Sequence, residues 1–155
     1  MNYLREYDAN CHTLSDIQAR IFEKASKEKI PSLYFIKSFS YNEETTMMDN
    51  LKFLDGFSSE EEIYISSKRK VKTNRGQIIN PVVMHWIGYF YRSFCYLYGF
   101  KSKEAFKLIE PNYLVKIYPL YHSQDIRKAI IWAILDLKIE RVDPKDKIRK
   151  LLLTI

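Results

Sequence analysis

Four side chains that could bind an anion or an acid recur along one stretch at steps of four, three and four: His85, Tyr89, Arg92 and Tyr96. In a helix this spacing places all four on one face. An arginine inside such a segment must find acceptors, because an unpaired buried charge is very costly. We expect Arg92 to be a structural tie, with an anion site as the alternative. Candidate partners are the carboxylates of Glu110 and Asp125, or exposed carbonyls at a helix end.

A second candidate is the segment from Tyr118 to Asp125, which combines a break between helices, two phenols, an imidazole and a helix start. His122 can titrate near neutral pH. Ser123 is its direct neighbour and cannot easily present a nucleophile to it, so the order of a Ser-His-Asp triad is missing. The pattern favours a packed corner between helices with a capping serine. An enzyme that uses Arg92 and His122 remains a third possibility for the function.

Metal and cofactor chemistry is not indicated by the remaining residue types. The three histidines are widely spread, and Cys11 and Cys95 lie far apart without a metal-binding spacing. The chain has no Gly-rich phosphate loop. We therefore expect no metal and no cofactor, and two reduced thiols, as is usual in a cytoplasmic protein.

Charge is distributed unevenly. Residues 1–62 hold 7 basic and 12 acidic side chains, a net charge of −5, whereas residues 63–155 have a net charge of +11. Such an asymmetry suits an acidic partner, either nucleic acid or the acidic surface of a protein. One basic cluster lies in a polar stretch and could attract phosphate without sequence preference: Lys68, Arg69, Lys70, Lys72 and Arg75. Solvated lysine-rich surface is the simpler interpretation of the same cluster.

A helix-turn-helix layout is also present, with residues 86–98, a turn at 99–101 and a short helix from Ser102 to Ile109. Three lysines of this region are candidate phosphate contacts: Lys101, Lys103 and Lys107. The second helix lacks the Arg, Asn and Gln side chains that usually recognise base edges. An ordinary helical hairpin is therefore the favoured interpretation.

The element that organises the chain is residues 81–98, where apolar side chains follow a helical period on almost every face. A helix that is apolar nearly all round is buried. It is also too short and too polar to span a membrane. The sequence thus predicts an all-α, compact, single-domain bundle (residues 1–155) around a central helix at about 81–98.

Start and stop signals divide the rest of the chain into shorter helices. We expect helices from Thr13 to Pro31, over 33–39, and from Asn42 to Asp55-Gly56. Gly99 ends the central helix, and further helices begin at Ser102, Pro111 and Ser123. Pro119 is expected to interrupt the helix that begins at Pro111. Residues 62–75 allow a loop, a short β hairpin or a frayed helix. Asp143-Pro144 begins a separable amphipathic helix within 139–155. Its apolar face is predicted to dock on another chain through Ile148, Leu151, Leu152 and Ile155.

Two blocks carry a resemblance to a known family: Trp86-Ile87-Gly88-Tyr89-Phe90-Tyr91-Arg92, and Tyr118 to Asp125 with its Tyr-x-x-Tyr-His-Ser-x-Asp pattern. Together with Ser-Lys-Glu at 102–104, and more loosely the segment 33–39, they resemble small, uncharacterised, all-helical bacterial proteins. The resemblance covers roughly residues 14–138. It implies a place in toxin–antitoxin or related defence operons, often beside an ADP-ribosyltransferase-like toxin.

The sequence therefore leads to three hypotheses about function. The first is a non-enzymatic protein-binding module, the antitoxin or accessory component of a toxin–antitoxin pair, acting in the bacterial cytoplasm on a protein partner or by self-association. The alternative is a nucleic-acid-binding regulator that uses the basic C-terminal half. The third is the enzyme described above, and no membrane association is expected.

Overall fold

The computed structural model describes residues 5–56 and 58–140 of this 155-residue chain. Within those ranges every regular element is a helix, which confirms the all-α prediction. The α-helices are α1 (Ala9–Lys27), α2 (Ser32–Tyr41), α3 (Thr46–Asp49), α4 (Glu60–Arg69), α5 (Pro81–Tyr98), α6 (Ser102–Leu108), α7 (Pro111–Tyr121) and α8 (Ile126–Asp136). Two 3₁₀ turns, η1 (Glu43–Thr45) and η2 (Lys52–Asp55), flank α3.

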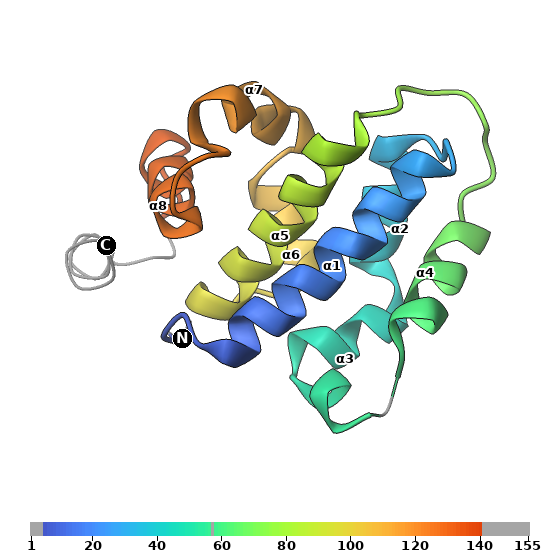
Figure 1. Ribbon diagram of the computed structural model, residues 1–155, viewed down its shortest axis with the longest axis horizontal. Coiled ribbons are helices and arrows are strands. Elements are labelled where there is room, and N and C mark those ends of the chain that lie inside the picture. Colours follow the sequence, from blue (N-terminus) through green and yellow to red (C-terminus); the bar gives the residue numbers. More distant parts are fainter. Residues whose placement is uncertain (1–4, 57, 141–155) are drawn as a thin grey trace.

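Helix α5 is the buried centre of the bundle, as the sequence predicts. Asn80 caps its start, Pro81 occupies its first position, and Gly99 ends it at φ 73° in the left-handed region. Helix α1 lies along α5, while α7 and α8 lie on one side of this pair and α2, α3 and α4 on the other (Figure 1). Phe90 and Phe94 are completely buried in the shared core.

The close approach of α1 and α5 depends on Gly88. A Cβ atom added there would lie 2.7 Å from the carbonyl oxygen of Gln18 and 3.0 Å from Cα of Ala19. Any larger residue would therefore force the two helices apart.

Helix α1 starts earlier than expected, at Ala9 instead of Thr13, because the Asp8 carboxylate accepts a hydrogen bond from the backbone N–H of Cys11 and caps the helix there.

The possible β hairpin at residues 62–75 is wrong, because the first part of this stretch is helix α4. Ser59 caps α4, and three glutamates occupy its first turn, where the helix dipole favours negative charge. The run Ile63-Tyr64-Ile65, whose residue types favour β structure, follows the helical period instead, with Ile63 and Tyr64 buried and Ile65 exposed. After Arg69 the chain has no regular structure until Pro81, so the loop alternative holds for that second part.

Three of the expected boundaries in the C-terminal half also differ. Lys101, not Ser102, is the N-cap residue of α6, and Asp125, not Ser123, caps α8 by accepting from the N–H of Arg127. Pro119 does not interrupt α7, which continues to Tyr121. Since Pro119 lies in the last turn, it removes only a single helical hydrogen bond. None of the described helices is both long and apolar enough to cross a bilayer.

Candidate functional site

Arg92 is buried and bonded within the fold, and its partners are not the expected ones. The side chain is 1% exposed and makes three short hydrogen bonds. Its Nε donates to the Gln18 side chain at 2.7 Å, its Nη1 to Asp49 at 2.7 Å, and its Nη2 to the Ser102 hydroxyl at 2.6 Å. The ion-pair partner is therefore Asp49, from the short helix α3, and neither Glu110 nor Asp125. Each guanidinium nitrogen donates to a partner inside the fold, and the buried side chain is therefore not accessible to an external anion.

The other polar residues of α5 are bound to α1 or to its cap. His85 Nδ1 lies 2.7 Å from Glu23, Tyr89 Oη lies 2.8 Å from His12 Nδ1, and the Tyr96 hydroxyl donates to Asp8 at 2.9 Å. The polar face predicted from the sequence is thus the α1–α5 seam. Its residues hold the two helices together.

One part of the predicted set does meet in a pocket. Tyr89 of α5 lines a cavity of about 320 Å³ with His122 and Asp125, and the rest of its lining is Tyr7, Trp86, Gln124 and Ile126. His122 stacks on Tyr118 with ring centroids 4.6 Å apart, and its Nδ1 donates to the Tyr118 carbonyl at 2.9 Å. The two sequence blocks that carry the family resemblance therefore form neighbouring walls of one pocket.

Two acid–base groups of this pocket, Asp125 and Tyr89, are already engaged within the fold. Asp125 caps α8 and accepts from the Arg127 guanidinium, which holds the pKa of Asp125 below its ordinary value. Burial, followed by the hydrogen bond to Tyr7, raises the pKa of Tyr89. Among the described residues the lining contains neither serine nor cysteine. This arrangement supplies a shaped cavity, without a nucleophile placed beside a base.

The two cysteines are free and buried thiols, as expected. Burial raises the pKa of Cys11 to about 11 and that of Cys95 to about 12. A thiol that stays protonated and buried is a poor nucleophile and a poor metal ligand. The described part of the chain also contains no cluster of His, Cys, Asp and Glu able to hold a metal ion.

The basic cluster begins in the last turn of α4 and continues into the loop after it, and its side chains are divided between two directions. The Lys68 Nζ lies 3.0 Å from Glu28 at the end of α1, and the Tyr64 hydroxyl donates to the same carboxylate at 2.6 Å. Lys70 and Lys72 instead line a groove against α2. Arg69 and Arg75 are exposed and do not line it.

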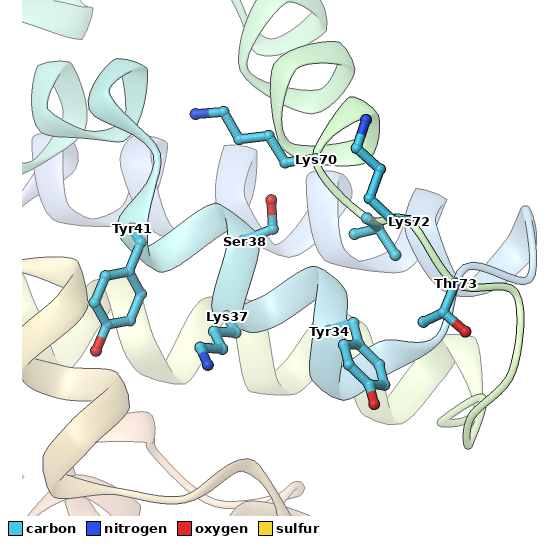
Figure 2. A pocket seen from close by; sticks show the side chains of 8 residues that line it. Tyr34, Lys37, Ser38, Tyr41, Lys70, Lys72 and Thr73 are labelled. Atoms are coloured by element: carbon cyan, nitrogen blue, oxygen red, sulfur yellow. The ribbon is translucent and has the colours of Figure 1, made fainter.

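This Tyr–Lys groove has a volume of about 490 Å³ and lies between α2 and residues 70–73. Figure 2 shows Tyr34, Lys37 and Tyr41 following one another along α2, with the other wall formed by the chain after α4. The complete lining is Tyr34, Lys37, Ser38, Tyr41, Lys70, Val71, Lys72 and Thr73. Tyr34 is 55% exposed and Tyr41 46%, so both rings present apolar surface to solvent.

The walls of the Tyr–Lys groove are fixed by hydrogen bonds between α2 and α4. The Ser38 hydroxyl donates to the Ser67 carbonyl at 2.7 Å, and the Asn42 side chain donates to Ser66 and Ser67. Gly76 lets the following segment pass close to the start of α2, because a Cβ there would lie 3.0 Å from Cβ of Pro31. The groove is therefore a preformed feature of the fold.

The helix-turn-helix candidate is a packed hairpin. Helix α6 has seven residues, it contacts both α2 and α5, and its first residue, Ser102, is bonded to Arg92 and Asp49. Lys101 and Lys103 are exposed on it, and Lys107 Nζ lies 5.9 Å from the ring of Tyr41. Lys107 thus extends the positive charge of the Tyr–Lys groove. The proposed docking residues Ile148, Leu151, Leu152 and Ile155 lie outside the described residues.

Comparison with known proteins gives no further assignment. No protein-family model matches the chain, and searches of curated protein sequences and of solved structures find no similar protein. The resemblance to toxin–antitoxin components therefore stays a prediction. The Tyr–Lys groove, at about 490 Å³, is larger than the pocket beside His122, at about 320 Å³.

Proposed function

We propose that the protein is a non-enzymatic module that binds a protein partner through the Tyr–Lys groove. The observation that carries this proposal is the pair of exposed tyrosines, Tyr34 and Tyr41, set in a preformed groove with lysines at its rim. Tyrosine is enriched among the residues that dominate binding energy, and a partly apolar centre with a charged rim is the usual anatomy of a protein interface. The polar groups most suited to catalysis, by contrast, are engaged within the fold.

We further propose that the partner is the toxin of a bacterial toxin–antitoxin pair, with this chain as the antitoxin or an accessory component. This step is supported by the resemblance of residues 86–92 and 118–125 to small helical proteins of such operons. A cytoplasmic location is supported by the two free, buried thiols.

The experiment is co-purification with defined candidates. The tagged full-length chain is co-expressed with the product of each gene adjacent to its own, as wild type and as the double variant Tyr34→Ala/Tyr41→Ala. Leu120→Ala is the matched control, since Leu120 is 68% exposed on α7, away from the groove. Truncating exposed side chains changes stability little, so the variants should melt like the wild type.

We expect one neighbouring product to be retained by the wild type and by the control, and to bind the double variant about tenfold or more weakly. Equal retention by the double variant contradicts the proposal, as does failure of the wild type to retain any neighbouring product. Loss of partner binding on Leu120→Ala alone would indicate instead an interface on α7 and α8, where Trp132 and Leu135 are also exposed.

Nucleic-acid binding is the second candidate, because single strands bind where lysines and exposed aromatic rings lie together. Lys37, Lys70, Lys72 and the two tyrosines provide that combination. Its test is the retention of a single-stranded oligonucleotide, measured at rising salt concentration. Oligonucleotide binding that depends on Tyr34 and Tyr41 and weakens steeply with rising salt would favour this alternative.

A further inference from the structure

We infer that the Tyr–Lys groove accepts an acidic, extended segment of the partner, with an apolar or aromatic side chain seated between Tyr34 and Tyr41. This inference rests on the proposed function and specifies the chemistry of the partner. It is built from the charge balance of the groove, its apolar lining, the backbone that forms one wall, and the exclusion of other occupants.

The charge of the groove is not balanced by the protein itself. Elsewhere on the surface, several cations have a carboxylate partner: Arg20, Lys24, Lys27, Lys68 and Arg127. In the described part of the chain no carboxylate lies within ion-pair distance of Lys37, Lys70 or Lys72, and Lys70 contacts only the neutral amide of Asn42, at 3.3 Å. Three cations around one hollow without an acidic lining residue attract a negatively charged ligand.

The lining favours a peptide over a small hydrated anion. Tyr34, Tyr41 and Val71 contribute apolar surface to the hollow, and Phe106 supports the Tyr41 ring from behind in an edge-to-face contact with centroids 6.2 Å apart. Apolar surface of this kind gains free energy when another apolar side chain covers it. A ligand that satisfies both features carries carboxylates on either side of an apolar residue.

The second wall of the groove can pair with an extended chain. Residues 71–75 belong to no helix, and the Arg75 N–H is occupied by the Thr73 hydroxyl. For the backbone N–H and C=O groups of Lys72 and Thr73, no hydrogen-bond partner occurs within the described ranges. Open main-chain groups beside a side-chain pocket are what an added strand uses for recognition.

Other occupants fit less well. The segment 141–155 of this chain carries five basic and two acidic residues, so it is positively charged like the groove and is repelled by it. A second copy offers the acidic run at the start of α4, but Glu60 and Glu61 are already paired with Arg20 and Lys24. A nucleic-acid backbone carries a negative charge at every nucleotide, so on leaving the groove past Tyr41 it would bring a phosphate against Glu43 and Glu44, whereas a peptide can be uncharged at that point.

The test is a selection of random peptides displayed on phage against the immobilised full-length chain. Selected peptides are synthesised, and their affinity is measured for the wild type and for Lys37→Glu/Lys72→Glu. The control is Lys103→Glu/Lys128→Glu, which reverses two exposed lysines outside the groove and changes the net charge equally. Thermal melting of all three proteins verifies that each is folded.

We expect the selected peptides to be rich in Asp and Glu around an aromatic residue or leucine. Reversal of the groove lysines should weaken their binding about tenfold or more, whereas the control should bind like the wild type. Peptides without acidic enrichment, acidic peptides that bind both variants equally, or recovery of no groove-dependent peptide overturns the inference. An oligothymidylate that binds the groove more tightly than every selected peptide also overturns it.

The two proposals fail in distinguishable ways. If the neighbouring gene product is lost on Tyr34→Ala/Tyr41→Ala while the selected peptides are not acidic, the protein-binding function stands and the acidic-segment inference is wrong. If acidic peptides bind the groove while the gene product binds the double variant normally, the groove chemistry is right and the proposed partner site is wrong.

Discussion

Replacing Arg92 by methionine should destabilise the protein by about 3–5 kcal/mol, because it removes one partner of a buried ion pair. Methionine fills most of the space of the arginine stem, so the loss is mainly electrostatic. The Asp49 side chain is only 11% exposed and would lose the guanidinium 2.7 Å away. Gln18 and Ser102 would each lose a hydrogen bond of 2.7 Å or less.

The assay is urea unfolding of the single variants Arg92→Met and Asp49→Asn and of the double variant. In the double variant the side chain at position 49 is neutral, so removal of the guanidinium leaves no buried charge. The asparagine oxygen can still accept from the Ser102 N–H, which lies 3.1 Å from the Asp49 oxygen in the wild type. The double variant should therefore be more stable than the sum of the single effects predicts, by about 1–3 kcal/mol.

The control is the same cycle with Glu110→Gln in place of Asp49→Asn. Glu110 is the exposed residue before α7 and makes no contact with Arg92, so its effect should add to that of Arg92→Met. An Arg92→Met variant that unfolds at the wild-type urea concentration would refute the structural role. Additive behaviour with Asp49 would refute the ion pair as its cause.

Three further predictions concern the core, the α1–α5 contact and pH. Phe94→Ala should lower the free energy of unfolding by about 3–5 kcal/mol, since it leaves a cavity at a fully buried site, and a variant that melts like the wild type would contradict the central position of α5. Gly88→Ala should destabilise by about 1–3 kcal/mol in urea unfolding despite the better helix propensity of alanine, because the new Cβ would lie 2.7 Å from the Gln18 carbonyl; a gain in stability would contradict the close packing. The lowered pKa of Asp125 means that its pair with Arg127 contributes stability above the unfolded-state pKa, and that this contribution disappears as the pH falls below about 4. The stability difference between wild type and Arg127→Gln, measured by unfolding at several pH values, should accordingly shrink in acid, and a difference that grows would contradict it.

The central helix α5 could be predicted from the sequence, because residues at its two ends and along its length mark it. Pro81 and Gly99 bracket α5, and its nearly continuous apolar surface indicates burial. Helix α4 was only one of three alternatives, as a frayed helix, because Ile63-Tyr64-Ile65 favours strand by propensity. The capping serine and three glutamates before it were the stronger signal, and they start a helix.

The partners of the site residues were not predictable, because they depend on contacts between distant segments. Arg92 pairs with Asp49, 43 positions earlier, in a stretch that the sequence predicts as one helix from Asn42 to Asp55 and that is in fact divided into η1, α3 and η2. The Tyr–Lys groove likewise combines Tyr34 with Lys72 across α4. Part of its signal was present in the sequence: Tyr34, Lys37 and Tyr41 share a helix face opposite the buried Phe35, Ile36 and Phe39.

The most direct test of the central claim is photo-crosslinking at the groove. A photoreactive phenylalanine analogue replaces Tyr34 in one protein and Leu120 in another, each is co-expressed with the neighbouring gene product, and crosslinked peptides are identified by mass spectrometry. The structure predicts a crosslink from position 34 to an acidic segment of the partner and none from position 120. A partner crosslinked from position 120 and not from position 34 would contradict the assignment of the Tyr–Lys groove as the binding site.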